Sequence, residues 1–228
     1  LENEDPNEND IEINNNNLNS LTNTIDSNLL SEKVNIVGLY DPEENGLNID
    51  MWSNSNGNEI KLILNKINKM NLSKDSREIL DIALLTNSYF PKKNIIDEEF
   101  IDFKLNYLIS NNNNELIKLY LIKNESSIHN SKLIKFYINS YLENAELESA
   151  CEIFNKLKYF DDDYINKFNI YCLINQNKRE EAQLLFDLKK ETGFKDDFFE
   201  DKFNFLMEYT ENADNQISDK NILNFFLS

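Results

Sequence analysis

The chain has 228 residues, a mass of 26.9 kDa and a formal charge of −18. With 40% hydrophobic residues, it has enough apolar material for the core of one ordinary domain or two small ones. The negative charge argues against nucleic-acid binding by charge neutralisation and against adhesion to an anionic membrane. Polar residues interrupt every apolar run before the roughly 20 residues that a spanning helix needs, so we expect no membrane insertion.

Asparagine is the commonest residue type, whereas the chain has only four glycines and three prolines. We therefore expect asparagine to occupy the turns and helix ends that glycine and proline usually take. Residues 1–30 consist mainly of Asn, Asp, Glu, Ser and Thr and lack aromatic side chains, which is typical of a disordered acidic tail. Residues 31–58 are more apolar, and we expect an ordered loop that Trp52 anchors to the first helices.

Residues 59–228 are predicted to form an α-helical repeat domain. Apolar residues recur at helical spacing from Ile60 to Ile67, and a second helix is expected to begin near Ser73 and to end before Pro91. The run from Leu116 to Ile122 could also pass for a strand, but helical spacing prevails, so we predict an all-α fold of roughly nine to eleven helices. Asn and Asp clusters mark the expected helix boundaries, at residues 111–114, 124–130, 143–145, 161–163 and 175–177.

Residues 131–154 match residues 163–186 at an offset of 32 positions. Each copy has the pattern of a helix, a tight polar turn and a second helix, which is typical of stacked helical hairpins. A small residue lies in the middle of each second helix, where the two helices should cross, and an aromatic residue follows four positions later to fill the wedge between hairpins. The matched pairs are Phe136 with Phe168, Ile138 with Ile170, Leu142 with Ile174, Glu148 with Glu180, Ala150 with Ala182, and Phe154 with Phe186.

Over residues 131–188 this pattern resembles the tetratricopeptide-like repeat superfamily, with Tyr141 late in one first helix as a further point of resemblance. The resemblance implies an antiparallel helical-hairpin solenoid with a concave groove that binds peptides. Ile138 and Ile170 depart from the pattern, because that family has Gly or Ala there, and no proline closes either unit. Weaker copies can be drawn over residues 98–123 and 196–227.

Two short motifs, Gly38-Leu39-Tyr40-Asp41 and Asp50-Met51-Trp52, are similar to the start of an uncharacterised bacterial family of exported helical-repeat proteins. This resemblance implies a removed leader upstream and a location in the bacterial periplasm or envelope, and it implies no activity. A cytoplasmic location is the alternative.

The sequence offers little catalytic chemistry, and we expect neither a metal nor a cofactor. His129 is the only histidine, so a triad or metal cluster built on several histidines is excluded. Residues 161–163 are interpreted as a helix cap, and the acidic cluster at residues 196–201 as a solvated helix start. No glycine-rich loop is present to hold phosphate. An enzyme would have to use Asp, Glu, Lys or Tyr alone.

Cys151 and Cys172 both lie on apolar stripes, and we predict two buried free thiols. A hairpin that turns near Phe160 places Cys151 opposite Phe168, which displaces Cys172 by about 6 Å along the helix axis. With helix axes about 8–10 Å apart, the two Cα atoms would be farther apart than the roughly 7 Å that a disulfide allows.

A peptide-binding groove is expected on the first helix of each hairpin. Lys135 and Lys167 fall at equivalent positions, and two stacked lysines flanked by Asn and Tyr could hold an acidic or C-terminal peptide segment. An ordinary solvated face is the alternative. The residues predicted on this face are Lys132, Lys135, Asn139, Glu143, Tyr164, Lys167, Tyr171 and Asn175.

The expected function is a non-catalytic interaction scaffold for a protein or peptide partner, an acidic one included. The alternatives are an enzyme or accessory domain with Asp, Glu and Tyr in a pocket, and a structural part of a longer repeat array. The array is favoured by residues 217–228, where Ile222, Phe225 and Phe226 open an amphipathic stripe without a capping unit. We therefore expect a missing continuation, or a partner, at Phe225 and Phe226.

Overall fold

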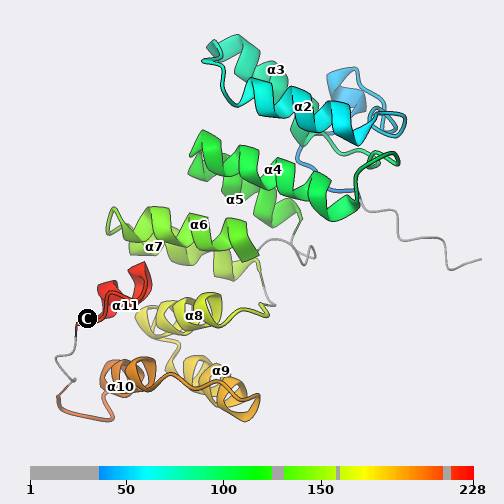
Figure 1. Cartoon of the computed structure of the whole chain (residues 1–228). Helices are drawn as coiled ribbons and strands as arrows, with labels where there is room; N and C mark the ends of the chain where they lie inside the picture. Colours follow the sequence, from blue (N-terminus) through cyan, green and yellow to red (C-terminus); the bar gives the residue numbers. More distant parts are fainter. Residues whose placement is uncertain (1–35, 125–130, 158–159, 213–216) are drawn as a thin grey trace, which may run out of the picture. The chain divides into compact units, whose positions relative to one another are not determined.

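Ten α-helices and two short 3-10 helices, with no strand, make up the part of the chain that the computed structural model describes, residues 36–124, 131–157, 160–212 and 217–228 (Figure 1). The predicted all-α class is confirmed. The predicted disordered tail and His129 lie outside the described residues. In chain order the elements are η1 (Glu43–Asn45), α2 (Gly57–Ile67), α3 (Lys74–Leu85), α4 (Asp97–Asn111), α5 (Asn114–Lys123), α6 (Ser131–Leu142), α7 (Leu147–Cys151), η3 (Glu152–Asn155), α8 (Asp163–Asn175), α9 (Arg179–Glu191), α10 (Asp197–Leu206) and α11 (Ile222–Leu227).

Asparagine does form many of the helix ends, as the composition predicts. Asn113 caps α5 by accepting a hydrogen bond from the backbone N–H of Leu116, and Asn221 caps α11 in the same way. Asn112 and Asn177 adopt positive φ angles of 49° and 60° where α4 and α8 have ended. Asparagine tolerates the left-handed region better than most residues, so it ends these helices where glycine is absent.

The loop before α2 packs closely against the backbone at the C-terminal end of α3. The backbone N–H of Leu39 donates to the carbonyl of Leu85 at 2.5 Å, and the N–H of Asn87 donates to the carbonyl of Tyr40 at 2.9 Å. A Cβ atom on Gly38 would lie 2.6 Å from the backbone nitrogen of Asn87, so only glycine fits there. Farther along, the Trp52 ring lies 5.6 Å from that of Phe100 in α4.

The helices from α4 onward pack in an ordered succession. α6 contacts α4 on one side and α8 on the other, and α8 also contacts α10. The intervening helices α5, α7 and α9 each pack beside the helix that precedes them in the chain (Figure 1). One apolar cluster extends from Val37 to Cys172 and also includes Leu223 of α11, and a second joins α8, α9 and α10 around Phe186 and Phe203.

The two matched segments differ in their second helices. α9 has 13 residues, whereas α7 has only five and continues as the 3-10 helix η3. Ala150 and Ala182 are both fully buried, at the equivalent positions expected for close helix packing. Phe186 is buried in α9, but Phe154 lies on η3 and is half-buried. The matched residues therefore keep their burial pattern only in part, because the chain leaves the α-helical path at Cys151.

Candidate functional site

The predicted groove residues lie on α6 and α8, two helices in contact with each other, except Glu143, which directly follows α6. Their lysines are already engaged within the chain. Lys135 Nζ lies 2.6 Å from Asp162 Oδ2, and Lys167 Nζ lies 2.8 Å from Asp196 Oδ2. Asp162 is also the N-cap of α8 and Asp196 the N-cap of α10, so each lysine reaches the start of a following helix.

The Lys167–Asp196 pair is buried, with side-chain exposures of 7% and 13%. Lys167 Nζ also lies 5.9 Å from the ring centre of Phe199. Burial raises the pKa of the Asp196 carboxyl, but the hydrogen bonds from Lys167 and from the Phe199 N–H outweigh it, so the pKa falls below its usual value. The carboxylate therefore stays charged against the ammonium, and Lys167 does not present a free cation to a ligand.

Most other predicted groove residues make contacts within the chain. Lys132 donates to Asn106 Oδ1 of α4 at 2.6 Å, and the hydroxyl of Tyr164 donates to Asn139 Oδ1. The ring of Tyr171 meets that of Phe226 edge-on at 6.0 Å. Glu143 and Asn175 are exposed. Except for Glu143, the predicted residues do lie on two neighbouring helices, but ion pairs and hydrogen bonds within the chain already engage most of their polar groups.

Helix α11 covers part of this face. Leu223 is fully buried in the first apolar cluster, and Leu227 packs against both clusters. Burial raises the pKa of the Tyr164 hydroxyl to about 12, while a hydrogen bond with the backbone of Leu223 acts in the opposite direction. Phe226 is half-buried, whereas Phe225 is 66% exposed. Phe225 and Phe226 were both expected to be exposed. The structure leaves Phe225 exposed, but Phe226 is half-buried.

An apolar cavity of about 650 Å³ lies between α6 and α11. We call it the α11 groove. Leu142, Ile222 and the two phenylalanines give it an apolar lining, and Glu143 and Asp219 add two carboxylates. The sequence singled out Glu143 for one predicted face and Ile222, Phe225 and Phe226 for an open stripe, but it did not predict that they meet, because their meeting depends on the path of the chain between α10 and α11. The residues lining it are Leu142, Glu143, Asp219, Asn221, Ile222, Phe225 and Phe226.

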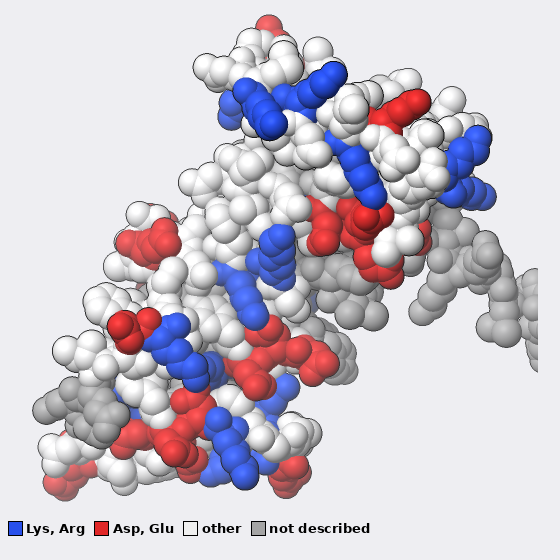
Figure 2. Space-filling model, viewed as in Figure 1, with Lys and Arg blue, Asp and Glu red and all other residues white. Residues whose placement is uncertain are grey.

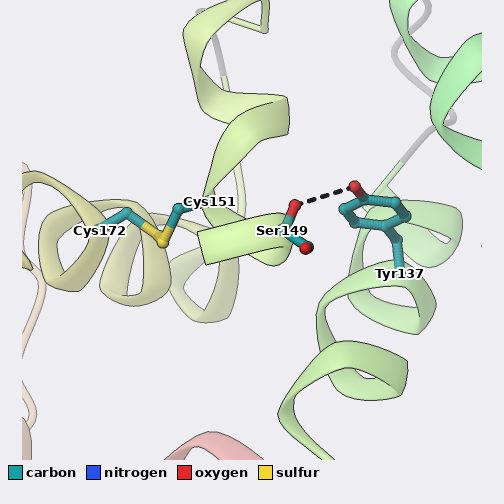
Figure 3. Close-up of a disulfide and its surroundings, with 4 residues drawn as sticks. All are labelled: Tyr137, Ser149, Cys151 and Cys172. Atoms are coloured by element: carbon teal, nitrogen blue, oxygen red, sulfur yellow. Dashed lines mark hydrogen bonds between the residues drawn. A yellow bond between two sulfur atoms is a disulfide. The ribbon is translucent and has the colours of Figure 1, made fainter. Parts of the chain in front are cut away.

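The prediction of free thiols is wrong, because Cys151 and Cys172 form a disulfide with their Cα atoms 5.5 Å apart (Figure 3). The predicted register assumed one straight helix as far as Phe160. Instead α7 ends at Cys151, and the chain passes through η3 before α8 begins at Asp163. Figure 3 also shows the hydroxyl of Tyr137 donating to the carbonyl of Ser149, at 3.1 Å. α7 is therefore joined to α6 by a hydrogen bond and to α8 by a covalent bond.

A smaller cavity of about 290 Å³ lies beside the disulfide. Phe154, Leu157, Cys172 and Leu173 supply its apolar lining, and Lys178 and Glu181 its charged groups, together with Asn155, Asn169 and Gln176. Neither of these two cavities brings a carboxylate together with a tyrosine. Within the described ranges, no cluster of three or more His, Cys, Asp or Glu residues gathers as a metal site would require. No described helix is both long and apolar enough to cross a bilayer.

Sequence reasoning also missed Lys104 of α4, which is 0% exposed. Its Nζ donates to the carbonyl of Val37 at 2.5 Å and lies 5.3 Å from the ring centre of Phe100. Burial lowers the pKa of the ammonium to about 7. A signal was available in the sequence, because Lys104 falls on the apolar stripe formed by Phe100, Ile101, Leu105 and Leu108.

Comparison with known proteins returned no match: no family model, no curated protein and no solved structure matches this chain. The resemblance to tetratricopeptide-like repeats thus stays a prediction from the residues of the chain itself.

Proposed function

We propose that α4 to α10 form a stack of antiparallel helical hairpins of the tetratricopeptide-like kind, with α4, α6, α8 and α10 as the first helices. In support, each of these helices packs against the next first helix along the chain. The ion pairs of Lys135 with Asp162 and of Lys167 with Asp196 join successive first helices in the same way. These pairs repeat between neighbouring hairpins, as expected of a repeat protein in which each unit contacts only its neighbours.

We further propose that the protein is a non-catalytic interaction scaffold that takes up a short apolar segment of a partner protein in the α11 groove. The observation that carries this function is the exposed Phe225 beside an apolar cavity of about 650 Å³. Cavities of this size with an apolar lining and a few polar groups are the usual form of a ligand site. An exposed large aromatic side chain at such a cavity favours contact with another molecule.

This site differs from the lysine groove expected on α6 and α8. A partner there would have to displace Asp162 from Lys135 and Asp196 from Lys167. In the α11 groove, Glu143 and Asp219 supply negative charge. The segment that fits best therefore carries an apolar anchor residue next to a lysine or arginine, because carboxylates at the edge of an interface favour a partner of opposite charge.

We also propose that the folded protein works in an oxidising compartment, in agreement with the expected periplasmic or envelope location. The Cys151–Cys172 disulfide supports this, because disulfides persist in oxidising compartments and are rare in the cytosol. Mass mapping of the protein from its native source without reductant tests it. Recovery of both thiols in free form would contradict the proposed location.

The proposed binding site is tested with the variant Phe225→Asp. The full chain and the variant are each immobilised and used to capture partner proteins from native extract. Leu184→Asp on α9 is the matched control, because Leu184 is an apolar residue that is 63% exposed and lies outside the α11 groove. We expect Phe225→Asp to lose the captured partner and Leu184→Asp to keep it, with the same circular dichroism spectrum and melting temperature in both. Equal capture by the two variants would exclude the α11 groove as the binding site.

A further inference from the structure

The negative charge of the chain is unevenly distributed. Between Lys61 and Ile79, five cations face two acidic residues, a local balance of +3 in a chain whose formal charge is −18. Figure 2 shows lysine and arginine side chains gathered over α2 and α3. The cations of this stretch are Lys61, Lys66, Lys69, Lys74 and Arg77.

Large apolar side chains lie exposed among these cations. Ile63 on α2 is 53% exposed, Met70 in the turn is 63% exposed, and Ile79 on α3 is 69% exposed. The core contacts of these helices lie elsewhere, at Ile60 and Leu64 of α2 and at the C-terminal end of α3. We use the name α2–α3 corner for the exposed large apolar and basic residues of this stretch, which are Leu62, Ile63, Lys66, Lys69, Met70, Lys74, Arg77 and Ile79.

The cations of the α2–α3 corner differ from those of the predicted groove. Lys61, which lies outside the corner, pairs with Glu99 at 2.7 Å. In the described part of the chain, the six ion pairs include neither Lys66, Lys69 and Lys74 nor Arg77, and all four of these residues are exposed. Positive charge beside exposed apolar side chains is thus available here, whereas at Lys135 and Lys167 it is neutralised within the chain.

We propose that the α2–α3 corner binds an acidic amphipathic helix of another protein. The exposed Ile63 lies three positions before Lys66 on α2, so the two share one face of the helix; Ile63 matches the apolar stripe of such a partner, and the cation beside it matches its carboxylates. Charge complementarity selects this partner over a lipid surface. The formal charge of −18 opposes approach to an extended anionic bilayer, whereas a short segment meets only the local charge within a screening length of about 8 Å.

The test uses the full chain and a fluorescent synthetic peptide with Leu at helical spacing and Glu at the other positions. Its control is a peptide of the same composition in scrambled order, which has the same charge but no apolar stripe. We expect the amphipathic peptide to bind more tightly than the scrambled one. We also expect its affinity to fall by at least about tenfold when the salt concentration is raised from about 50 to about 500 mM.

Lys66→Glu combined with Lys69→Glu should weaken peptide binding by at least about tenfold, because it reverses two exposed charges of the corner. Lys156→Glu combined with Lys195→Glu is the matched control, since both of these lysines are exposed and lie elsewhere. Ile63→Gln should abolish the preference for the amphipathic peptide over the scrambled one, because Ile63 shares a face of α2 with Lys66. The circular dichroism spectra of all three variants should match that of the unmodified chain.

Three results would overturn the proposal. The first is failure of the unmodified chain to prefer the amphipathic peptide, and the second is equal loss of binding in the two double-charge variants. The third is flotation with phosphatidylserine vesicles that depends on Lys66 and Lys69, without binding of the peptide, which would assign the corner to a lipid surface instead. None of these variants changes a residue of the α11 groove. The proposal for the α2–α3 corner can therefore fail while the proposal for the α11 groove stands, and the reverse.

Discussion

Lys104 in α4 and Lys167 in α8 are both almost completely buried, but their surroundings differ. Lys167 faces the carboxylate of Asp196, and the pair joins α8 to the start of α10. Lys104 donates to the carbonyl of Val37, and its Nζ lies 5.9 Å from the ring centre of Phe90 and 5.3 Å from that of Phe100. In the described residues, no carboxylate lies within ion-pair distance of it. A buried ammonium can thus be held by a full opposite charge or by carbonyl dipoles and ring faces alone.

The difference matters for what each lysine stabilises. Lys167 connects α8 to the start of α10, and its cost of burial is offset by attraction to the Asp196 carboxylate, which also accepts a hydrogen bond from the Phe199 N–H. Lys104 fastens the loop before α2 to α4, and only carbonyl dipoles and the nearby aromatic rings compensate its burial. The pKa of Lys104 consequently falls to about 7, so its charge can be removed within the physiological range of pH.

Asp196→Ala should have the largest effect on stability. It leaves the buried Lys167 ammonium without its carboxylate, and without the carbonyl partners that Lys104 has. We expect the free energy of unfolding to fall by about 3–5 kcal/mol, the usual result of leaving one member of a buried pair uncompensated. Denaturant unfolding measures it. Asp197→Ala, which changes the exposed neighbouring carboxylate, is the control, and an equally small loss in both variants would show that the pair contributes little.

Reduction of the disulfide should have the next largest effect on stability. It acts near Lys167, because the bond holds α8, the helix that carries this lysine. The bond closes a loop with a sequence separation of 21, so its loss should lower the free energy of unfolding by about 2–4 kcal/mol. Unfolding with and without reductant measures this. The Cys151→Ala, Cys172→Ala double variant should no longer respond to reductant, and amide exchange in α4 should change less than in α8. A uniform change in both helices would contradict a local effect.

Lys104→Met should remove a pH dependence. In the folded chain Lys104 loses its proton near pH 7, whereas in the unfolded chain it keeps the proton up to its ordinary pKa of 10.5. Between these values the unfolded chain binds more protons, so the free energy of unfolding rises with pH, by up to about 1.4 kcal/mol per pH unit. In Lys104→Met this contribution should vanish, and the comparison is made by denaturant unfolding at pH 7, 8 and 9.

Lys123→Met is the control for this slope, since Lys123 Nζ also donates to a backbone carbonyl, that of Leu39, but from an exposed position. It should keep the dependence of the unmodified chain. The measurements stay below pH 10, because burial raises the pKa of Tyr120 and Tyr137 and unfolding then becomes favourable as the unfolded tyrosines ionise. An unchanged slope in Lys104→Met would mean that other groups carry it.

Lys135→Ala should have the smallest effect. Its ion pair with Asp162 occupies the position equivalent to the Lys167 pair, but the Lys135 side chain is 42% exposed. We expect a loss below about 1 kcal/mol, because water and salt screen such a pair. A double-mutant cycle with Asp162→Ala measures the coupling energy between Lys135 and Asp162. A coupling energy as large as that between Lys167 and Asp196 would show that burial does not determine how much each ion pair contributes to stability.

The helices were largely predictable from the sequence, because asparagine clusters mark where apolar stripes stop. The boundary predicted at residues 111–114 separates α4 from α5, and that at residues 175–177 follows α8. The disulfide was not predictable in this way. Its register depends on α7 ending at Cys151, and the apolar stripe continues through Phe154 without sign of the change to a 3-10 helix.

The candidate site was predictable only in part. The face of α6 and α8 follows from helical spacing, and the cap of α8 was expected at residues 161–163. Residues 196–201 were interpreted as a solvated helix start, but the Asp196 side chain is only 13% exposed: one of its oxygens caps α10 and the other pairs with Lys167, which the sequence left apparently free. The α11 groove depends on a long-range return of the chain, which no local pattern encodes.

The covalent link between α7 and α8 also determines how the chain would respond to mechanical tension. Pulling on the two ends cannot extend the segment between Cys151 and Cys172 while the bond is intact. At about 3.5 Å per residue, this withholds on the order of 70 Å of contour length, which reduction would release. Under force, the segment from the end of α7 to Cys172 in α8 would thus extend only in the reduced chain.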